Sequence, residues 1–138
     1  MHPTTTVYRL ADNPQDYAAC HKIMRANGSV DWDLHWPTVV AVRDKEIIGF
    51  LSSNKVSWCQ MAGPLELKKP SPFVVLRLIE SYEYVMRYMG VTQYCFFIAK
   101  SNKHWMTQAE ALGLRRIREN EENVFFERIL SEPLRLAA

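Results

Sequence analysis

The sequence has few cysteines, and their spacing argues against several classes of protein. Cys20, Cys59 and Cys95 are the only three, and no two of them form a Cys-x-x-Cys pair. An odd number of widely separated cysteines is not typical of a disulfide scaffold, a zinc site or a redox dithiol. We therefore expect reduced, mostly buried thiols and a cytoplasmic protein.

The sequence also lacks long apolar runs and a strong charge imbalance. No stretch of about 18 uncharged apolar residues is present, so we expect no membrane-spanning helix. The N-terminal sequence Met-His-Pro-Thr-Thr-Thr-Val has neither the basic start nor the apolar run of a secretion signal. The formal net charge is only +2, which gives no reason to expect a general affinity for nucleic acid.

Three catalytic motifs are missing. There is no Gly-x-Ser-x-Gly elbow, no Gly-x-x-x-x-Gly-Lys-Ser/Thr phosphate loop and no His-Glu-x-x-His pair. The chain has only five glycines, and none lies between Gly63 and Gly90. These absences argue against a serine hydrolase of the elbow type, a P-loop nucleotidase and a zinc peptidase.

The composition is that of an ordinary globular protein. Hydrophobic residues make up 48% of the chain, aromatic residues 12% and charged residues 23%. A chain of 138 residues can bury enough apolar surface to fold as one unit. We expect a single domain over residues 1–138, with its core at about 5–130 and a tail at 131–138.

Two helices are predicted by their capping residues. Asn13-Pro14 and Ser71-Pro72 each combine an N-cap side chain with a proline in the first helical position. The first pair predicts a helix over 14–26 with Gly28 after it, and the second predicts a long helix that ends at Gly90. A short third helix is expected to bury Trp105, Ala109 and Leu112.

Runs of β-branched and aromatic residues predict the strands. Residues 38–42 and 47–52 should form an antiparallel hairpin around the turn at 43–46. The next strand is expected at 57–61 or 64–67, or as one long strand bent at Gly63-Pro64. The remaining strands are expected at 7–10, 92–99, 114–118 and 123–129. This order predicts an α+β fold, with a mixed, mostly antiparallel sheet flanked by helices.

The segment from Lys100 to Leu114 resembles the last motif of the GNAT (Gcn5-related N-acetyltransferase) superfamily. In that family an Asn ends a strand, a short helix follows, and a Gly with an apolar residue begins the next strand. Asn102, Gly113 and Leu114 lie at those intervals. The resemblance implies a GNAT-like fold over about residues 5–130 and an acetyl-CoA-dependent N-acyltransferase. Ala109 stands where many members have the Tyr that acts as general acid.

The resemblance also implies where acetyl-CoA would bind, at the strand and helix start spanning residues 65–73. The family's Gln/Arg-x-x-Gly-x-Gly/Ala loop is absent, and Pro70 and Pro72 remove two N–H donors. The candidate cofactor-binding residues are Leu65, Leu67, Lys68, Lys69, Ser71, Val74, Val75 and Asn102. Alternatively, the two lysines are a solvated strand end, and Ser71 and Asn102 serve as helix N-caps.

Glu66 is the candidate catalytic base, because amine acylation needs a group that deprotonates the attacking amine. Its side chain must face the cleft, and a register error of one residue would turn it away. The alternative is an ordinary exposed strand Glu. For the acid, Tyr88, Tyr94 and His104 are remote substitutes for the missing Tyr.

The loop before the first hairpin contains the candidate acceptor-binding residues. Asp31 and Asp33 would suit a cationic amine, and Trp32 and Trp36 could pack beside it through cation–π contacts. The alternative is a loop that the tryptophans hold on the sheet. His35 completes a weak metal pattern with the two aspartates, but no second cluster supports it and no metal is expected.

Two functions remain open from the sequence. The first is a divergent GNAT-type N-acyltransferase that takes acetyl-CoA and an unidentified amine. The second is an inactive GNAT-fold module that binds a protein partner, similar to small degenerate members encoded by tailed bacteriophages, one of which is an internal virion protein. Several basic residues lie near the last expected helix, and they would contact coenzyme phosphates, an acidic partner or only solvent. They are Lys100, Lys103, Arg115, Arg116 and Arg118.

Overall fold

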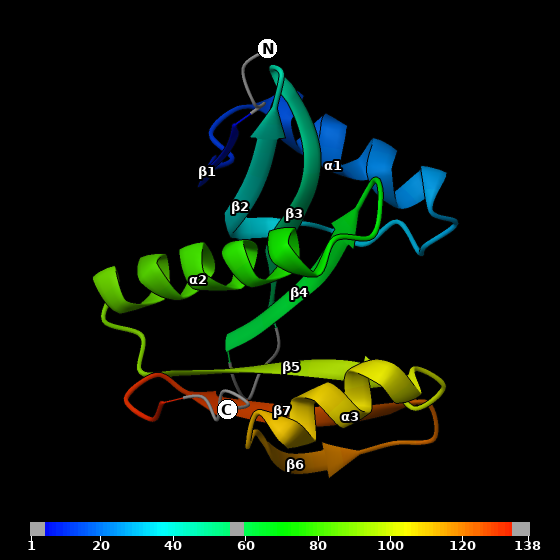
Figure 1. The fold of residues 1–138 in the computed structure, drawn as a ribbon, viewed down its shortest axis with the longest axis vertical. Helices are drawn as coiled ribbons and strands as arrows, with labels where there is room; N and C mark the ends of the chain where they lie inside the picture. The colour runs from blue at the N-terminus through cyan, green and yellow to red at the C-terminus, as the bar shows by residue number, and fades with distance from the viewer. Residues whose placement is uncertain (1–4, 56–59, 134–138) are drawn as a thin grey trace.

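The computed structural model describes residues 5–55 and 60–133. Three helices separate groups of one to three consecutive strands along the described chain (Figure 1). In chain order they are β1 (Thr6–Leu10), α1 (Pro14–Ala26), β2 (His35–Arg43), β3 (Glu46–Lys55), β4 (Gln60–Leu67), α2 (Pro72–Tyr88), β5 (Gln93–Ala99), α3 (Lys103–Ala111), β6 (Arg115–Glu119) and β7 (Asn123–Ile129).

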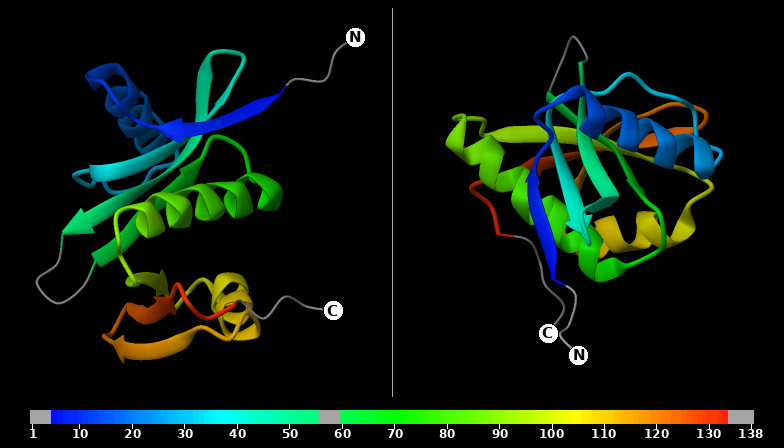
Figure 2. Two further views of the ribbon diagram at one scale, coloured as in Figure 1. Left: turned by 90° about the vertical axis from the view of Figure 1, so that its left-hand side faces the viewer. Right: turned by 90° about the horizontal axis from the view of Figure 1, so that it is seen from above.

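The seven strands form one sheet in the order β1-β2-β3-β4-β5-β7-β6. Every neighbouring pair is antiparallel except β4 and β5, which are parallel. Helix α1 lies on one face of the sheet, and α2 and α3 lie on the other (Figures 1 and 2). The predicted α+β fold with a mixed, mostly antiparallel sheet is confirmed.

Several strands differ from their predicted limits, and β3 runs on to Lys55 rather than ending at residue 52. Strand β2 begins at His35, earlier than expected, because His35 pairs with Ser53 before a register shift restores pairing at Val39. Strand β4 continues through Gly63-Pro64, as the bent-strand alternative predicts, and the register against β3 shifts there. The expected strand start at 57–59 lies outside the described residues.

The capping predictions for the first two helices are confirmed. Asn13 Oδ1 accepts the N–H of Asp16 at 2.9 Å, and Ser71 Oγ accepts that of Val74 at 3.3 Å. The prediction for the short third helix is wrong at Trp105, which is 37% exposed. In α3, Ala109 and Met106 form the side that packs on the sheet, so Trp105 lies at its rim.

Each face of the sheet has its own core. Beneath α2, Leu78, Tyr82 and Met86 pack on Val39 and Leu51 of the central strands. Beneath α1, a second cluster includes Cys20, Ile23, Met24, Val40 and Phe50. Side chains at alternating strand positions therefore belong to different layers, which fixes the face to which each residue of β4 points.

The described thiols are buried. Cys20 and Cys95 are both buried, and burial raises the pKa of the Cys20 thiol to about 12. This agrees with the expected burial of the thiols, while Cys59 lies outside the described residues. None of the described helices is long and apolar enough to cross a membrane.

An ion pair between an exposed arginine of β1 and a buried aspartate of α1 gives the stability a pH dependence. Arg9 donates to both carboxylate oxygens of Asp16, at 2.7 and 2.9 Å, and Asp16 is 5% exposed. This contact lowers the pKa of Asp16 from 3.8 to about 2. Because the folded pKa is lower than the unfolded one, the stabilisation is present above about pH 4 and is lost as the pH falls toward 2.

We expect this loss to be about 2 kcal/mol at most, since Arg9 is itself partly exposed to solvent. Urea unfolding followed between pH 6 and about pH 2.5 measures it, with Asp16→Asn as the reference. The variant should be less stable at pH 6, and the difference should shrink in acid. A constant difference across this range would contradict the assignment.

Candidate functional site

The two central strands of the sheet separate along most of their length. Strand β4 pairs with β5 at one position, Met61 with Cys95. Beyond it β4 runs on to Leu67 and β5 to Ala99, and the strands diverge (Figure 1). Among residues 5–55 and 60–133, no strand pairs with that side of β4 past Met61. We call this opening the β4–β5 notch.

The local sequence explains the divergence. The register against β3 shifts by one residue around Gly63-Pro64, so β4 carries a bulge there. Gly63 adopts a positive φ of 128°, a conformation that a side chain would disfavour. Pro64 has no N–H to offer a partner strand. A bulge redirects the strand that carries it, and here β4 bends away from β5.

The backbone of the strand beyond the bulge faces the notch at alternate residues. The N–H of Lys68 donates to Ile48 O at 2.8 Å, which directs this residue toward β3. Because an antiparallel ladder alternates, Glu66 also bonds toward β3, and the peptide groups of Leu65 and Leu67 point to the opposite side. The carbonyl of Leu67 accepts the side-chain amide of Asn27 at 3.0 Å.

Glu66 projects from the sheet face that α1 covers. It pairs with Phe50, which belongs to the core beneath α1, whereas its neighbours Leu65 and Leu67 pack beneath α2. Ser29, in the segment after α1, donates its hydroxyl to Glu66 Oε1. This half-buried carboxylate is therefore held in place by a residue 37 positions away in the sequence.

An aromatic contact lies on the same face of the notch. The rings of Trp32 and Phe97 meet edge to face, with centroids 6.4 Å apart. Tyr94 and Phe96 belong to the core beneath α2, so the alternation of β5 turns Phe97 toward α1 and toward the face of Glu66. Trp32 thus connects the segment after α1 to the far side of the notch.

The two predicted aspartates have different surroundings. Asp31 lies 2.6 Å from His21 Nδ1 and 3.7 Å from Arg25 Nη1, so residues of α1 already compensate its charge. Asp33 is exposed. Trp36 is 56% exposed and belongs to β2. The structure therefore brings Trp32 close to the notch and leaves Asp33 as the exposed carboxylate beside it in the sequence.

The N-terminus of α2 offers fewer donors than the sequence suggests. The N–H of Val74 is bonded to Ser71 Oγ, and the N–H of Val75 donates to Ser71 O at 3.1 Å. Val74 and Val75 are candidate cofactor-binding residues, but the backbone N–H of each is already hydrogen-bonded within this helix end. Among the described residues, no backbone acceptor for the N–H of Phe73 is found, so this group remains for an anion.

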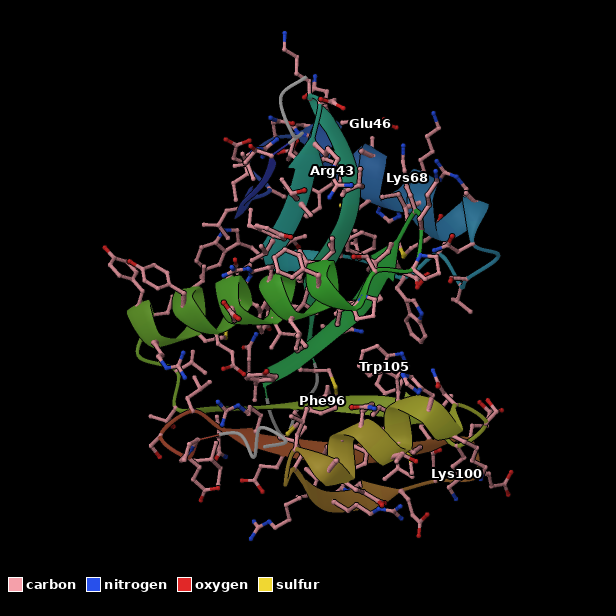
Figure 3. The ribbon with its side chains drawn as sticks, in the orientation of Figure 1. Arg43, Glu46, Lys68, Phe96, Lys100 and Trp105 are labelled. Carbon is pink, nitrogen blue, oxygen red and sulfur yellow. The ribbon has the colours of Figure 1, made fainter. Side chains whose placement is uncertain are left out.

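The two lysines before α2 are placed differently. Lys68 forms an ion pair with Glu46 at the end of the β3–β4 pair (Figure 3). Lys69 is exposed, and no ion pair with a described residue compensates it. Lys69 is thus the better placed of the two to supply an uncompensated positive charge near the start of α2.

The short helix α3 borders the other side of the notch. Asn102 caps it, since Asn102 Oδ1 accepts the N–H of Trp105 at 3.2 Å. The Trp105 side chain extends from α3 toward β4 in Figure 3. Ala109 is buried against Val124 and Phe126, and it carries no group that could transfer a proton. Trp105 therefore narrows the notch, whereas Ala109 leaves it without an acid.

The remote candidates for the acid are also poorly placed. Tyr94 is buried and donates to Glu83 Oε2 at 2.6 Å, and burial raises its pKa well above its ordinary value. Tyr88 is 86% exposed on α2. His104 is exposed on α3. In the described part of the chain, no three His, Cys, Asp or Glu side chains gather as a metal site.

Sequence reasoning missed several residues at the notch. Ser29 and Asn27 reach β4 from the end of α1, and Phe97 and Trp105 line the opposite side. The contacts of Ser29 and Asn27 join residues nearly 40 positions apart, so no local pattern announces them. Gly28 does predict the end of α1, but it does not predict which strand the following residues meet.

Comparisons with known proteins find similarity in fold but not in sequence. No protein-family model matches the chain, and no curated protein matches it in sequence. Many solved structures do match it in fold. The ribosomal-protein-S18-alanine N-acetyltransferase from Escherichia coli is similar over 97% of both chains, with a TM-score of 0.70 and 12% identity.

Two further structures are similar in fold. A putative acetyltransferase of the GNAT family from Desulfovibrio desulfuricans is similar over 91% of this chain and 99% of its own, with a TM-score of 0.69 and 10% identity. The PaiA N-acetyltransferase from Thermoplasma acidophilum, solved in complex with coenzyme A, is similar over 77% of this chain and 64% of its own, with a TM-score of 0.59 and 16% identity. The chain therefore has the GNAT fold, as its sequence resemblance implies.

Proposed function

We propose that this chain binds an acyl-CoA in the β4–β5 notch and transfers the acyl group to an amine. The observation that carries the proposal is the single pairing between β4 and β5, which leaves the N–H and C=O of Leu65 and the N–H of Leu67 directed into an opening, while Asn27 occupies the carbonyl of Leu67. An extended chain with amide groups, such as pantetheine, can pair with such a strand as a neighbouring strand would. Acetyl-CoA is the proposed donor.

The phosphates would lie at the start of α2. The positive end of a helix with an unsatisfied N–H suits an anion, and Phe73 provides that group while Lys69 adds a positive charge. Ser71, Val74 and Val75 shape this helix end through their mutual hydrogen bonds. Lys68 would contact the phosphates only after its ion pair with Glu46 opens. The cradle is weaker than a glycine-rich loop, so we propose modest affinity.

The amine would approach from the α1 face. Glu66 lies there, with Trp32 across the notch and Asp33 exposed next to Trp32 in sequence. In the reaction the amine nitrogen attacks the thioester carbon, the C–S bond breaks, and Glu66 takes the proton from the amine directly or through water. Coenzyme A would leave as a thiolate that solvent protonates, because Ala109 supplies no acid.

A charge placed at the start of α2 tests coenzyme binding without removing the helix cap. Asp caps a helix as well as Ser does, so Ser71→Asp should fold normally and repel the coenzyme phosphates. We expect calorimetry to show acetyl-CoA binding weakened at least 10-fold, or about 1.4 kcal/mol. The matched control is Asn13→Asp, the same kind of cap change on α1, which should bind as the wild type does.

The possible results separate the two functions that the sequence leaves open. Equal weakening by both variants would argue against phosphates at α2. Absence of wild-type binding at millimolar acetyl-CoA would reject the acyltransferase proposal and favour a protein-binding module. An active enzyme of this kind would work in the cytoplasm, where its acyl donor is found.

A further inference from the structure

The outer face of α2 is aromatic where a helix on a sheet should be polar. Its core side carries Leu78, Tyr82 and Met86. On the opposite side Phe73 is 62% exposed, Tyr84 72% and Tyr88 86%. A surface helix normally presents charged and polar residues on that side. A row of exposed rings instead indicates a contact surface.

The rings belong to one straight row that also contains a basic and an acidic residue. At helical spacing, Phe73, Arg77, Glu80, Tyr84 and Tyr88 follow one another along the same side of α2. Arg77 lies over the Phe73 ring at 5.2 Å and approaches Glu80 at 3.2 Å. We call these five residues the α2 row. In Figures 1 and 2 no described element covers it.

A concavity of about 320 Å³ lies beside the middle of the row, between α2 and the edge strand β1. Glu80, Ser81 and Tyr84 line it from the helix, and Tyr8 lines it from the strand. The hydroxyl of Tyr8 is buried and has no hydrogen-bond partner among the described residues. The concavity leaves room beside the row for side chains of a neighbouring molecule.

The order of the α2 row is self-complementary. Suppose that two copies of α2 are laid antiparallel about a two-fold axis between Glu80 and Ser81. Each residue then faces the residue of the second copy that lies equally far from the axis along the helix. Phe73 then meets Tyr88 of the second copy, and Arg77 meets Tyr84. Each ring has an aromatic or cationic partner, and Arg77 also comes within reach of Glu80 of the second copy.

We propose that a second copy of this chain packs on the α2 row, forming a two-fold dimer with antiparallel α2 helices. A symmetric dimer requires a surface that complements itself, and the row meets this requirement. Three rings from each copy, burying on the order of 150 Å² each, supply roughly half of the ~800 Å² per partner found in stable interfaces. The concavity beside β1 takes side chains from the edge of the second copy. This inference does not depend on the proposed acyltransferase activity.

Sedimentation velocity on the purified full chain, at micromolar to millimolar concentrations, tests the proposal. The wild type should sediment with the mass of two chains. Tyr84→Arg should be a monomer, because it opposes Arg77 of the second copy. Adding Arg77→Glu to that variant should restore the dimer, because opposite charges then meet across the axis. Circular dichroism confirms that each variant is folded.

Two controls make the test specific. Ile117→Arg changes an exposed apolar residue on β6, at the other edge of the sheet, and should leave the dimer intact. Glu80→Cys lies near the proposed axis and should be crosslinked between copies by a short bismaleimide, whereas Glu121→Cys in the β6–β7 turn should not. A wild type that stays monomeric, a dimer that survives Tyr84→Arg, or equal crosslinking at both cysteines would each overturn the proposal.

Discussion

Replacing Arg128 with methionine is expected to destabilise the protein by about 3–5 kcal/mol, the range for breaking a buried ion pair from one side. Glu83 on α2 and Arg128 on β7 form an ion pair, and both side chains are buried. Arg128 Nε donates to Glu83 Oε2 at 2.9 Å, and Nη2 donates to Oε1 at 3.1 Å. Methionine fills similar space, but it carries no positive charge to compensate the buried carboxylate of Glu83.

The rest of this cluster cannot replace the lost charge. Tyr94 already donates to Glu83, and its raised pKa keeps its hydroxyl protonated and neutral. Arg87 lies 3.6 Å from Glu83 Oε1, but its side chain is about half exposed and also donates to Leu130 O. Arg128 additionally donates to the carbonyls of Ile129 and Glu132, so these acceptors lose a donor too.

Urea unfolding of Arg128→Met measures this loss. Arg115→Met is the matched control, since Arg115 pairs with Glu127 of β7 at 2.8 Å but its side chain is 74% exposed. This substitution should lower the stability by less than about 1 kcal/mol. Combining Arg128→Met with Glu83→Met and Tyr94→Phe should recover much of the stability, because no buried charge then remains. Equal losses at Arg128 and Arg115 would contradict this account.

The elements that the sequence predicts best have local causes. The limits of α1 follow from Asn13-Pro14 and Gly28, and the limits of β7 from a run rich in aromatic and β-branched residues after a polar turn. The start of β2 is missed, because it depends on His35 pairing with Ser53 of another strand. Trp105 is placed wrongly because a nine-residue helix exposes most of its surface, and spacing alone does not decide which side packs.

The candidate site is less predictable than the fold because it consists of contacts between distant segments. The sequence does indicate that β4 bends at Gly63-Pro64, but not that β5 leaves it after one pair. Glu66 is found from the family resemblance, and its orientation depends on the register of the whole strand. Ser29 and Phe97 become visible only when α1, β4 and β5 are brought together.

The departures from the family pattern affect different steps of the proposed reaction. Occupied N–H groups at Val74 and Val75 weaken the hold on the phosphates, which concerns binding. Ala109 removes an acid for the leaving thiolate, which concerns turnover. Glu66 lies on the α1 face of the notch, from which the amine is proposed to approach. Binding and base catalysis are therefore separable, and each can be measured without the other.

Replacing Glu66 with glutamine is expected to lower kcat/KM for amine acylation by about 10²–10⁴-fold, the range for loss of a general base. Glutamine keeps the shape of the side chain, and its carbonyl oxygen can still accept the hydroxyl of Ser29. It cannot take a proton from the attacking amine. Acetyl-CoA binding should not change, because the coenzyme would contact the backbone on either side of Glu66 rather than its carboxylate.

Steady-state rates with acetyl-CoA and a panel of amines, together with calorimetry of acetyl-CoA, separate catalysis from binding. Ser29→Ala tests positioning, since it leaves the base and removes only the hydrogen bond that orients it. It should lower the rate less than Glu66→Gln does, and its pH profile should keep the limb of a catalytic base that Glu66→Gln loses. If Glu66→Gln retains full activity with normal coenzyme binding, the proton is taken by water or another group, and Glu66 only anchors the segment after α1.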